Sequence, residues 1–467
     1  MSAVPLSGLP GAGAGAGASR AQAALAANRS RALAAIRPLG LGRISEMVGL
    51  HLQVTGLRAA VGDLLEVQAT PPVLVEVVAS STEGLVCLPL GRLTGIQVGA
   101  YVRHTGGPLK IRVGEALRGR VLDGLGRPID GGPHLGSLAG MSLVDVDGNA
   151  PDALSRPTIS RQLGLGVRAL DSLVPCGRGQ RIGIMAGSGV GKSSLLSMIA
   201  RGTDAEVSVI ALVGERGREV REFIENDLGP EGLARSVVVV ATSDAPPVER
   251  VRSAFVATRI AESFRDAGRD VVLMMDSLTR VAMAQREIGL SAGEPPTTRG
   301  YPPSVFNLMP RLLERAGTSA TGSITGLYTV LVEGDDLQDP IGDTARSILD
   351  GHVVLTRRLA TAGHFPSIDV LESISRVTGA VTTPEQRADA VALRRMLAAH
   401  RDVKELVEIG AYVSGTDPEA DRAIARMPRI DAFLRQSMDD QTPVADTWAD
   451  LHALVADGPA ALPGAGR

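Results

Sequence analysis

The sequence is poor in several features that would assign it to a specialised class. Aromatic residues make up only 2% of the 467-residue chain, which argues against a large aromatic platform for nucleic acid. The formal net charge is −3, so the chain lacks a basic excess, and we expect no nucleic-acid partner. No uninterrupted apolar run approaches the roughly 18 to 20 residues that a membrane-spanning helix needs. The sequence therefore predicts a chain that does not cross a bilayer.

Cysteine is equally scarce. Cys87 and Cys176 stand far apart without the spacing of a metal site, which is typical of two reduced thiols in a cytosolic protein. Hydrophobic residues make up 44% and charged residues 21%, as in soluble globular proteins. Because the chain is too long for one hydrophobic core, we expect two or three domains.

The two ends of the chain differ from its centre. Residues 1–19 are of low complexity, and residues 20–37 show an Ala/Arg pattern that predicts a helix ending before Pro38. We interpret 1–40 as a flexible tail with a docking helix, although an acid-poor, arginine-bearing start is also typical of a transit peptide. At the other end, residues 381–467 predict a helical domain.

The remaining residues predict a barrel followed by an α/β core. Residues 41–107 alternate short apolar runs with glycine turns, which predicts a small antiparallel β-barrel. Residues 114–132 are turn-rich and are expected to bridge into the next domain. Across 108–380, apolar runs such as "RIGIMAG", "EVSVIALVG", "SVVVVAT" and "VVLMMD" alternate with helical stretches. This alternation predicts the α/β class, with a mainly parallel sheet covered on both faces.

The stretch "AGSGVGKSS" follows the first of these strands and precedes a helix. It matches the P-loop pattern Gly-x-x-x-x-Gly-Lys-Ser/Thr, except that Ala186 occupies the first position. Such a loop closes backbone N–H groups around phosphates, and the following helix adds a favourable dipole. We expect Lys192 to bridge the β- and γ-phosphates and Ser193 to supply a hydroxyl to Mg²⁺. The predicted nucleotide-binding residues are Gly187, Ser188, Gly189, Val190, Gly191, Lys192, Ser193 and Ser194.

Two carboxylates end strands at the edge where the phosphates are expected. Asp276 closes the run "VVLMMD" and is a candidate for the Mg²⁺ shell. Glu215 closes "IALVGE", where a carboxylate can polarise the attacking water. The core is therefore predicted to hydrolyse a nucleoside triphosphate.

Six motifs in a fixed order add a family resemblance. They are "AGSGVGKSSLL", "VGERGREVREF", "MMDSLTR", "REIGLSAGEPPTTRGYPPSVFNLMPRLLERAG", "GSITGLYTVLVEGDD" and "GHFPSIDVLESISR". The last matches the signature Pro-[Ser/Ala]-[Ile/Leu/Val]-[Asp/Asn]-x-x-x-Ser-x-Ser. Residues 41–440 thus resemble the catalytic subunits of the rotary ATP synthase superfamily, and within it the ATPases of bacterial flagellar protein export. The resemblance implies a RecA-like P-loop core with ATP and Mg²⁺ as cofactors.

The resemblance also implies individual roles. By position in the motifs, Glu215 corresponds to the catalytic carboxylate, Arg216 to a phosphate-side arginine and Glu219 to an acid that orders magnesium-bound water. Arg280 corresponds to an arginine at the γ-phosphate, Phe365 to an aromatic ring against adenine and Arg376 to an arginine finger. An arginine finger acts on a neighbouring subunit, so the resemblance implies a ring, most simply a homohexamer.

Several alternatives remain beside flagellar export. The virulence-type (injectisome) secretion ATPases resemble the sequence almost as well. The rotary ATP synthase β subunit differs in its acidic "DELSEED"-type segment, which the helical end here lacks. A Rho-like RNA translocase shares the P-loop, the glutamate and the finger, but it needs aromatic and basic residues in its barrel, and residues 41–107 contain one aromatic, Tyr101.

The resemblance implies a cytoplasmic ATPase at the inner face of the cell membrane that powers type III protein export and releases substrates from their chaperones. The implied partners are further copies of the chain, an export regulator or stator at the N-terminal segment, export-gate proteins, and chaperones with their substrates. Whether Tyr412 also lines the nucleotide site is left open.

Overall fold

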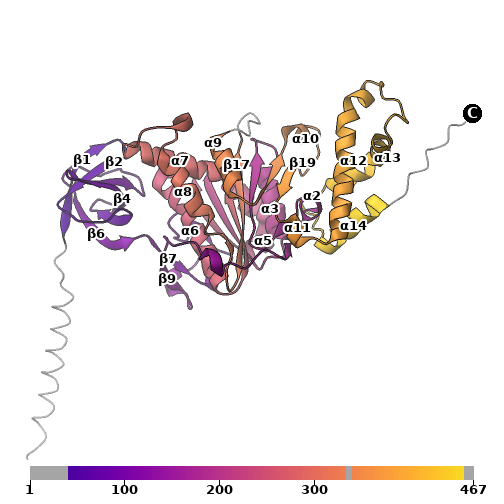
Figure 1. The fold of residues 1–467 in the computed structure, drawn as a ribbon. Coiled ribbons are helices and arrows are strands. Elements are labelled where there is room, and N and C mark those ends of the chain that lie inside the picture. The colour runs from indigo at the N-terminus through magenta and orange to yellow at the C-terminus, as the bar shows by residue number, and fades with distance from the viewer. Residues whose placement is uncertain (1–39, 333–338, 457–467) are drawn as a thin grey trace, which may run out of the picture.

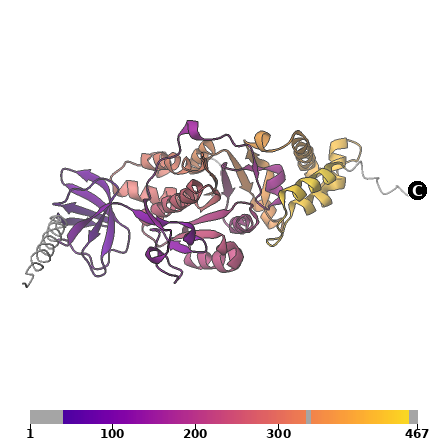
Figure 2. The same ribbon diagram turned by 90° about the horizontal axis from the view of Figure 1, so that it is seen from below.

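The computed structural model describes residues 40–332 and 339–456. A β-barrel, a central α/β layer and a helical end follow one another along an elongated molecule (Figure 1, Figure 2). This arrangement confirms the predicted fold class. The predicted tail and docking helix lie outside the described residues, as does the end of the chain beyond residue 456. Within the described ranges, no helix is long and apolar enough to cross a membrane.

Six antiparallel strands close the barrel in the order β1-β2-β5-β4-β3-β6. Side chains alternate between its interior and its surface; in β2, for example, Leu52 and Val54 are buried while their neighbours are half-exposed. The strands are β1 (Leu41–Val48), β2 (His51–Thr55), β3 (Asp63–Val67), β4 (Val73–Ser81), β5 (Gly84–Pro89) and β6 (Tyr101–Pro108).

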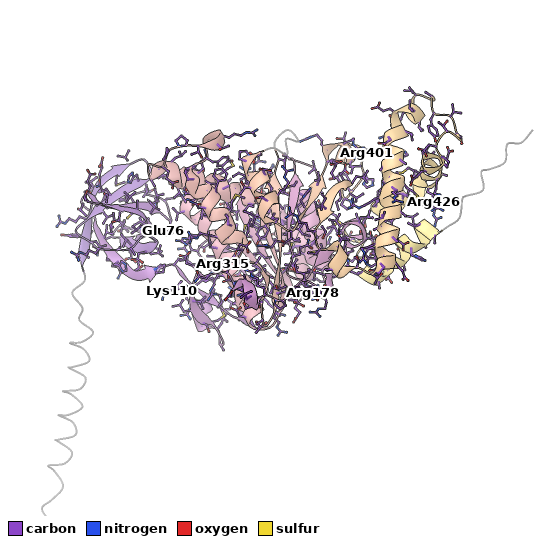
Figure 3. The ribbon with its side chains drawn as sticks, in the orientation of Figure 1. Glu76, Lys110, Arg178, Arg315, Arg401 and Arg426 are labelled. Atoms are coloured by element: carbon purple, nitrogen blue, oxygen red, sulfur yellow. The ribbon has the colours of Figure 1, made fainter. Side chains whose placement is uncertain are left out.

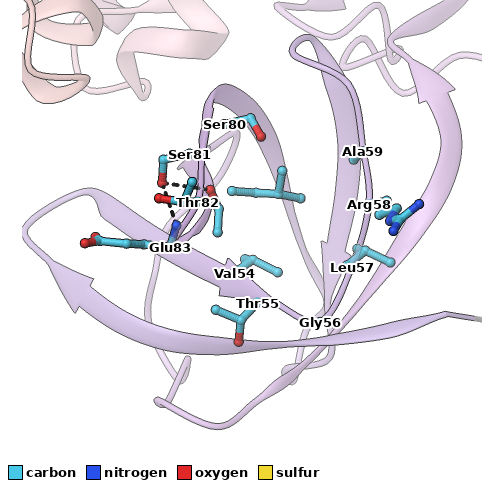
Figure 4. A pocket seen from close by; sticks show the side chains of 12 residues that line it. Val54, Thr55, Gly56, Leu57, Arg58, Ala59, Ser80, Ser81, Thr82 and Glu83 are labelled. Atoms are coloured by element: carbon cyan, nitrogen blue, oxygen red, sulfur yellow. Dashed lines mark hydrogen bonds between the residues drawn. The ribbon is translucent and has the colours of Figure 1, made fainter.

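The surface of the barrel is polar where a cavity opens on it. The cavity has a volume of about 430 Å³ and lies between the end of β2 and the β4–β5 turn (Figure 4). Its lining, residues 54–59 and 80–85, contains no aromatic side chain. The aromatic ring of Tyr101 lies under the guanidinium of Arg43, 4.6 Å from it. The described barrel residues therefore do not form the aromatic platform that single-stranded RNA requires.

The central sheet is mainly parallel, with strand order β19-β18-β12-β17-β15-β13-β14-β8. Its pairs are parallel except at β18–β19 and at β16, which pairs with β17. The strands are β8 (Val121–Asp123), β12 (Arg181–Ala186), β13 (Val207–Glu215), β14 (Ser236–Thr242), β15 (Asp270–Asp276), β16 (Gly317–Thr318), β17 (Ser323–Leu331), β18 (Gly351–Leu355) and β19 (Ile368–Ser375).

Three of these strands were not predicted: β8, the two-residue β16 and β19. The segment 114–132, expected to be only a bridge, also supplies the short edge strand β8. β19 follows the signature motif and was missed because Asp369, Glu372 and its serines interrupt the apolar pattern. An edge strand tolerates such residues because one of its sides is not covered by another strand.

Helices cover both faces of the sheet. In β13, Val209 and Ala211 join the core beneath α6, whereas Ile210 and Leu212 join the core that contains α3. This alternation explains why the strands read as continuous apolar runs. The helices are α2 (Arg168–Leu173), α3 (Lys192–Gly202), α4 (Gly217–Glu222), α5 (Gly229–Ala234), α6 (Pro247–Asp266), α7 (Leu278–Ser291), α8 (Pro303–Leu313), α9 (Pro340–Ile348), α10 (Arg357–Thr361) and α11 (Thr378–Val381).

Shorter elements and the helical end complete the fold. Two small sheets pair β7 (Lys110–Val113) with β9 (Ser142–Asp145) and β10 (Gln162–Leu163) with β11 (Cys176–Gly177). The helical end consists of α12 (Pro384–Glu408), α13 (Pro418–Leu434) and α14 (Val444–Ala456). A capping box at Thr383 and Gln386 begins α12.

Buried ion pairs join the barrel to the core. Arg252 of α6 bonds both carboxylate oxygens of Glu76 in β4, at 2.7 and 2.6 Å, and also bonds Asp147. Within the core, the guanidinium of Arg315 is 1% exposed and bonds both oxygens of Glu262 at 2.7 Å. Figure 3 labels Glu76 at the barrel and Arg315 in the core. The bidentate pair of Arg252 with Glu76 fixes the barrel against α6.

Candidate nucleotide-binding and catalytic site

The predicted P-loop connects the end of β12 to the start of α3. Gly189 and Gly191 have φ angles of +74° and +90°, a region that favours glycine. Gly191 is the N-cap of α3, and no side chain caps the N–H groups of the first turn. Unsatisfied N–H groups at a helix N-terminus bind phosphate readily. The backbone therefore has the form that the sequence pattern predicts.

Lys192 lies between the two predicted carboxylates. Its Nζ is 2.5 Å from Oδ1 of Asp276 and 3.3 Å from Oε1 of Glu215. Burial lowers the pKa of Lys192, but attraction from Asp276 and Glu215 outweighs it, so the pKa lies above its usual value. Burial raises the pKa of Glu215, and the charge of Asp276 adds to this while Lys192 opposes it. The cluster concentrates charge at one edge of the sheet, which is typical of catalytic sites.

Glu219 and two arginines extend this cluster. Burial alone raises the pKa of Glu219, but hydrogen bonds from Arg216, at 2.9 Å, and from Glu215 lower it overall. The aliphatic part of Arg280 packs against Gly214, where a Cβ would come within about 3.0 Å of it. The Nε of Arg280 is buried without a hydrogen-bond partner among the described residues. An arginine with an unpaired donor next to Gly214, the residue before Glu215, fits a site for an oxygen-rich ligand such as a phosphate.

The donor set also fits Mg²⁺. The hydroxyl-bearing Ser193 lies at the start of α3, and Asp276, 3% exposed, points its carboxylate at the adjacent Lys192. The described residues contain no cluster of three His, Cys, Asp or Glu side chains that would hold a metal by themselves. Magnesium is commonly held by one or two protein oxygens together with substrate phosphates, and Ser193 and Asp276 would supply such oxygens.

Phe365, predicted to pack against adenine, lies beside the P-loop. Its ring is 3.5 Å from the position of a Cβ at Gly191, and the residue is 47% exposed, so part of its surface is open to a ligand. Two contacts that sequence reasoning missed lie nearby. Arg357 donates to the carbonyl of Ser188, and Ser367 donates to the carbonyl of Val190.

Arg376 lies at the opposite edge of the sheet from the P-loop. Ile368, at the start of β19, is level with Leu355 and thus with Ala186, whereas Ser375 is level with Gly351. Because β19 bulges, its eight residues lie beside only five residues of β18, Gly351 to Leu355, and Arg376 bonds the carbonyl of the next residue, Asp350. Arg376 therefore lies about 16 Å along the sheet from the level of Ala186, at about 3.3 Å per residue of β18. Arg376 donates to the carbonyl of Arg346. The structure thus gathers the other predicted side chains but keeps Arg376 away from the P-loop of its own chain.

Tyr412, whose role the sequence leaves open, lies in the helical end. Its hydroxyl bonds the carbonyl of Asp417 and the carboxylate of Asp421 in α13.

Comparison with known proteins agrees with this geometry. Residues 166–375 match the nucleotide-binding domain of the ATP synthase alpha/beta family, and residues 382–453 match the T3SS EscN ATPase C-terminal domain. The flagellum-specific ATP synthase of Bacillus subtilis is 49% identical over 88% of this chain and 94% of its own length. The type 3 secretion system ATPase of Xanthomonas euvesicatoria is also 49% identical, over 89% of this chain and 94% of its own length.

A solved structure supports the same assignment. The assembled ATPase EscN from the type III secretion system of enteropathogenic E. coli matches with a TM-score of 0.84 and 45% identity, over 89% of this chain and 100% of EscN. The chain therefore belongs to the ATP synthase alpha/beta family, and it is an ATPase of the branch that contains the flagellum-specific and type 3 secretion ATPases.

Proposed function

We propose that the protein hydrolyses Mg²⁺-ATP to drive protein export through a flagellar type III apparatus. The observation that carries the catalytic part is the contact of Lys192 with both Glu215 and Asp276 under the P-loop. Flagellum-specific relatives support the flagellar assignment. Type 3 secretion ATPases are similar to the same degree, so injectisome export is the second candidate.

Each of the predicted site residues has a separate role in the proposed reaction. Lys192 binds the β- and γ-phosphates, Glu215 orients and polarises the attacking water, and Arg280 contacts the γ-phosphate. Glu219 fixes Arg216 through their ion pair and orders water at the metal. Ser193 and Asp276 would hold a magnesium ion, which would supply charge neutralisation at the phosphates. Phe365 stacks on the adenine.

Loss of Lys192 tests this assignment. Lys192→Ala removes the cation placed to reach the phosphates, so turnover should fall to background and ATP should bind more weakly. Near-normal turnover of this variant with Mg²⁺-ATP would refute the P-loop assignment.

Arg376 acts in trans within a ring, which we propose to be a homohexamer. Its position about 16 Å along the sheet from the P-loop side, at about 3.3 Å per residue of β18, supports action on a neighbouring subunit. The relative EscN was solved as an assembled ATPase, which supports the ring. An arginine finger can contribute roughly 10³ to 10⁵ in rate, so isolated subunits should be almost inactive.

Mixing two inactive variants tests the shared site. Arg376→Ala lacks the finger and Glu215→Gln lacks the catalytic carboxylate, so each pure ring should turn over little. A mixed ring contains interfaces that pair an intact Glu215 with an intact Arg376, and these should restore activity. No restoration, in rings shown to be mixed, would mean that Arg376 acts in cis or is structural.

The export role extends to partners and location. We propose a cytoplasmic enzyme associated with the inner face of the membrane, which contacts export-gate proteins and releases substrates from chaperones. A regulator or stator is proposed to bind the N-terminal segment; the relative EscN forms a complex with its central stalk EscO, which supports a partner of this kind. Deleting the gene and restoring it with or without Glu215→Gln, while motility and secretion are measured, tests this. ATPase stimulation by poly(C) would instead favour an RNA translocase.

A further inference from the structure

The connection between β18 and β19, residues 356–367, contacts the outer side of the P-loop at two peptide groups. Nη2 of Arg357 donates to the carbonyl of Ser188 at 3.2 Å. Oγ of Ser367 donates to the carbonyl of Val190 at 2.6 Å. These carbonyls belong to the peptide groups that immediately precede Gly189 and Gly191. The proposed catalytic roles use neither side chain.

Fixing a carbonyl also fixes the following N–H. Both peptide bonds are trans, and in a planar trans peptide the C=O and N–H point in opposite directions. A Val190 carbonyl that is held outward therefore aims the N–H of Gly191 inward, and the Ser188 carbonyl does the same for the N–H of Gly189. Inward N–H groups are the donors with which a P-loop holds phosphate oxygens.

These two peptide groups are the ones that most need fixing. Gly189 and Gly191 adopt φ angles of +74° and +90°. Glycine occupies positive and negative φ about equally well, so a peptide group next to it can rotate with little steric cost. Such a rotation would turn an N–H away from the phosphates.

We propose that Ser367 and Arg357 are positioning residues that hold the P-loop in its phosphate-binding form before nucleotide arrives. The proposal rests on the proposed role of the P-loop as a phosphate cradle. Ser367 has the larger effect, because it is 2% exposed and its bond is short. The bond of Arg357 is longer and lies at the exposed surface, so water competes with it more strongly.

The proposal has a kinetic consequence that a purely structural role lacks. If only a fraction of molecules has the competent loop, apparent affinity falls by that fraction. Bound nucleotide itself selects the competent loop, so turnover at saturation should hardly change. Ser367→Ala should therefore raise KM for ATP by about five- to tenfold, the scale of one buried hydrogen bond, with kcat within about twofold.

Pyrophosphate has no base, so its binding tests the P-loop independently of the site that is proposed to hold the adenine. Calorimetric titration with pyrophosphate and with ADP should show the same five- to tenfold weakening in Ser367→Ala. Ser367→Thr keeps the hydroxyl and should recover most of the affinity. Ser236→Ala is a matched control, because Ser236 is fully buried and donates to the carbonyl of Gly232 at 2.7 Å, away from the P-loop. It should leave both affinities unchanged.

Several results would overturn the proposal. They are unchanged pyrophosphate affinity in Ser367→Ala, weaker ADP binding without weaker pyrophosphate binding, and a loss confined to kcat. If Ser367→Ala does not fold, Arg357→Ala on the surface provides the test, with an expected two- to threefold loss for pyrophosphate; no loss would refute it. Failure of the unsubstituted protein to bind either ligand would instead reject the nucleotide site itself.

Discussion

The pairing of Lys192 with Asp276 predicts opposite effects of one substitution on two forms of the substrate. In the structure the ammonium of Lys192 is 2.5 Å from Asp276, so it must loosen this ion pair to reach phosphate oxygens. Asp276→Asn keeps the shape of the side chain but removes the competing charge. ATP without magnesium should then bind more tightly. Mg²⁺-ATP should bind more weakly, because the proposed metal shell loses its carboxylate.

The gain in affinity for magnesium-free ATP can be estimated from the ion pair between Lys192 and Asp276. A hydrogen bond to a charged group contributes about 1.5–3 kcal/mol net, and about 1.4 kcal/mol corresponds to a tenfold change in affinity. The Asn oxygen still accepts a hydrogen bond, so the lower end applies. We expect magnesium-free ATP to bind Asp276→Asn about tenfold more tightly than it binds the unsubstituted protein.

Calorimetry with ATP in EDTA and in magnesium measures both effects. Glu215→Gln is the comparison, because its contact with Lys192 is longer, at 3.3 Å, and it leaves Asp276 in place. It should give a smaller gain in EDTA and keep the response to magnesium. If Asp276→Asn weakens binding equally under both conditions, Asp276 does not compete for Lys192 and the reasoning is wrong.

Three further predictions concern other parts of the molecule. Burial raises the pKa of Glu215 above its usual 4.5, so this carboxyl keeps its proton to a higher pH; kcat/KM should fall as pH is lowered through a value above 4.5, and an acid limb at or below 4.5 would contradict this. Arg252→Met leaves buried Glu76 unpaired and should cost about 3–5 kcal/mol in urea unfolding, whereas adding Glu76→Leu should recover most of it. Phe365→Ala should weaken ADP binding by the roughly 1–3 kcal/mol of one base stack but leave pyrophosphate binding unchanged in the same calorimeter.

The sequence was sufficient to place residues that end apolar strands or directly follow them. Glu215 and Asp276 end β13 and β15, which are adjacent and parallel, so their side chains emerge at one edge. The P-loop follows β12 in the same sheet, two strands away from β15. Strand direction alone therefore brings Lys192 to both carboxylates.

The sequence could not reveal residues whose contacts depend on which strands are neighbours in the sheet. Arg357 and Ser367 reach the P-loop only because β18 pairs with β12, a neighbour almost 170 positions earlier in the chain. The same pairing shows where Arg376 lies: antiparallel β19 carries it away from the P-loop. The sequence pattern specified neither the partner nor the direction of β19, since its polar residues conceal it as a strand.

The signature motif that carried the family resemblance now has a physical explanation in its three serines. Ser367 donates to the P-loop at Val190. Ser373 donates to the carbonyl of Asp369 and accepts the N–H of Val354, which fills the bulge between β18 and β19. Ser375 donates to the carbonyl of Pro175 and accepts from Gln180, which places the residue before Arg376. The motif therefore fixes one edge strand at its start, its bulge and its end, and that strand separates the P-loop of this chain from the arginine proposed to act on the next.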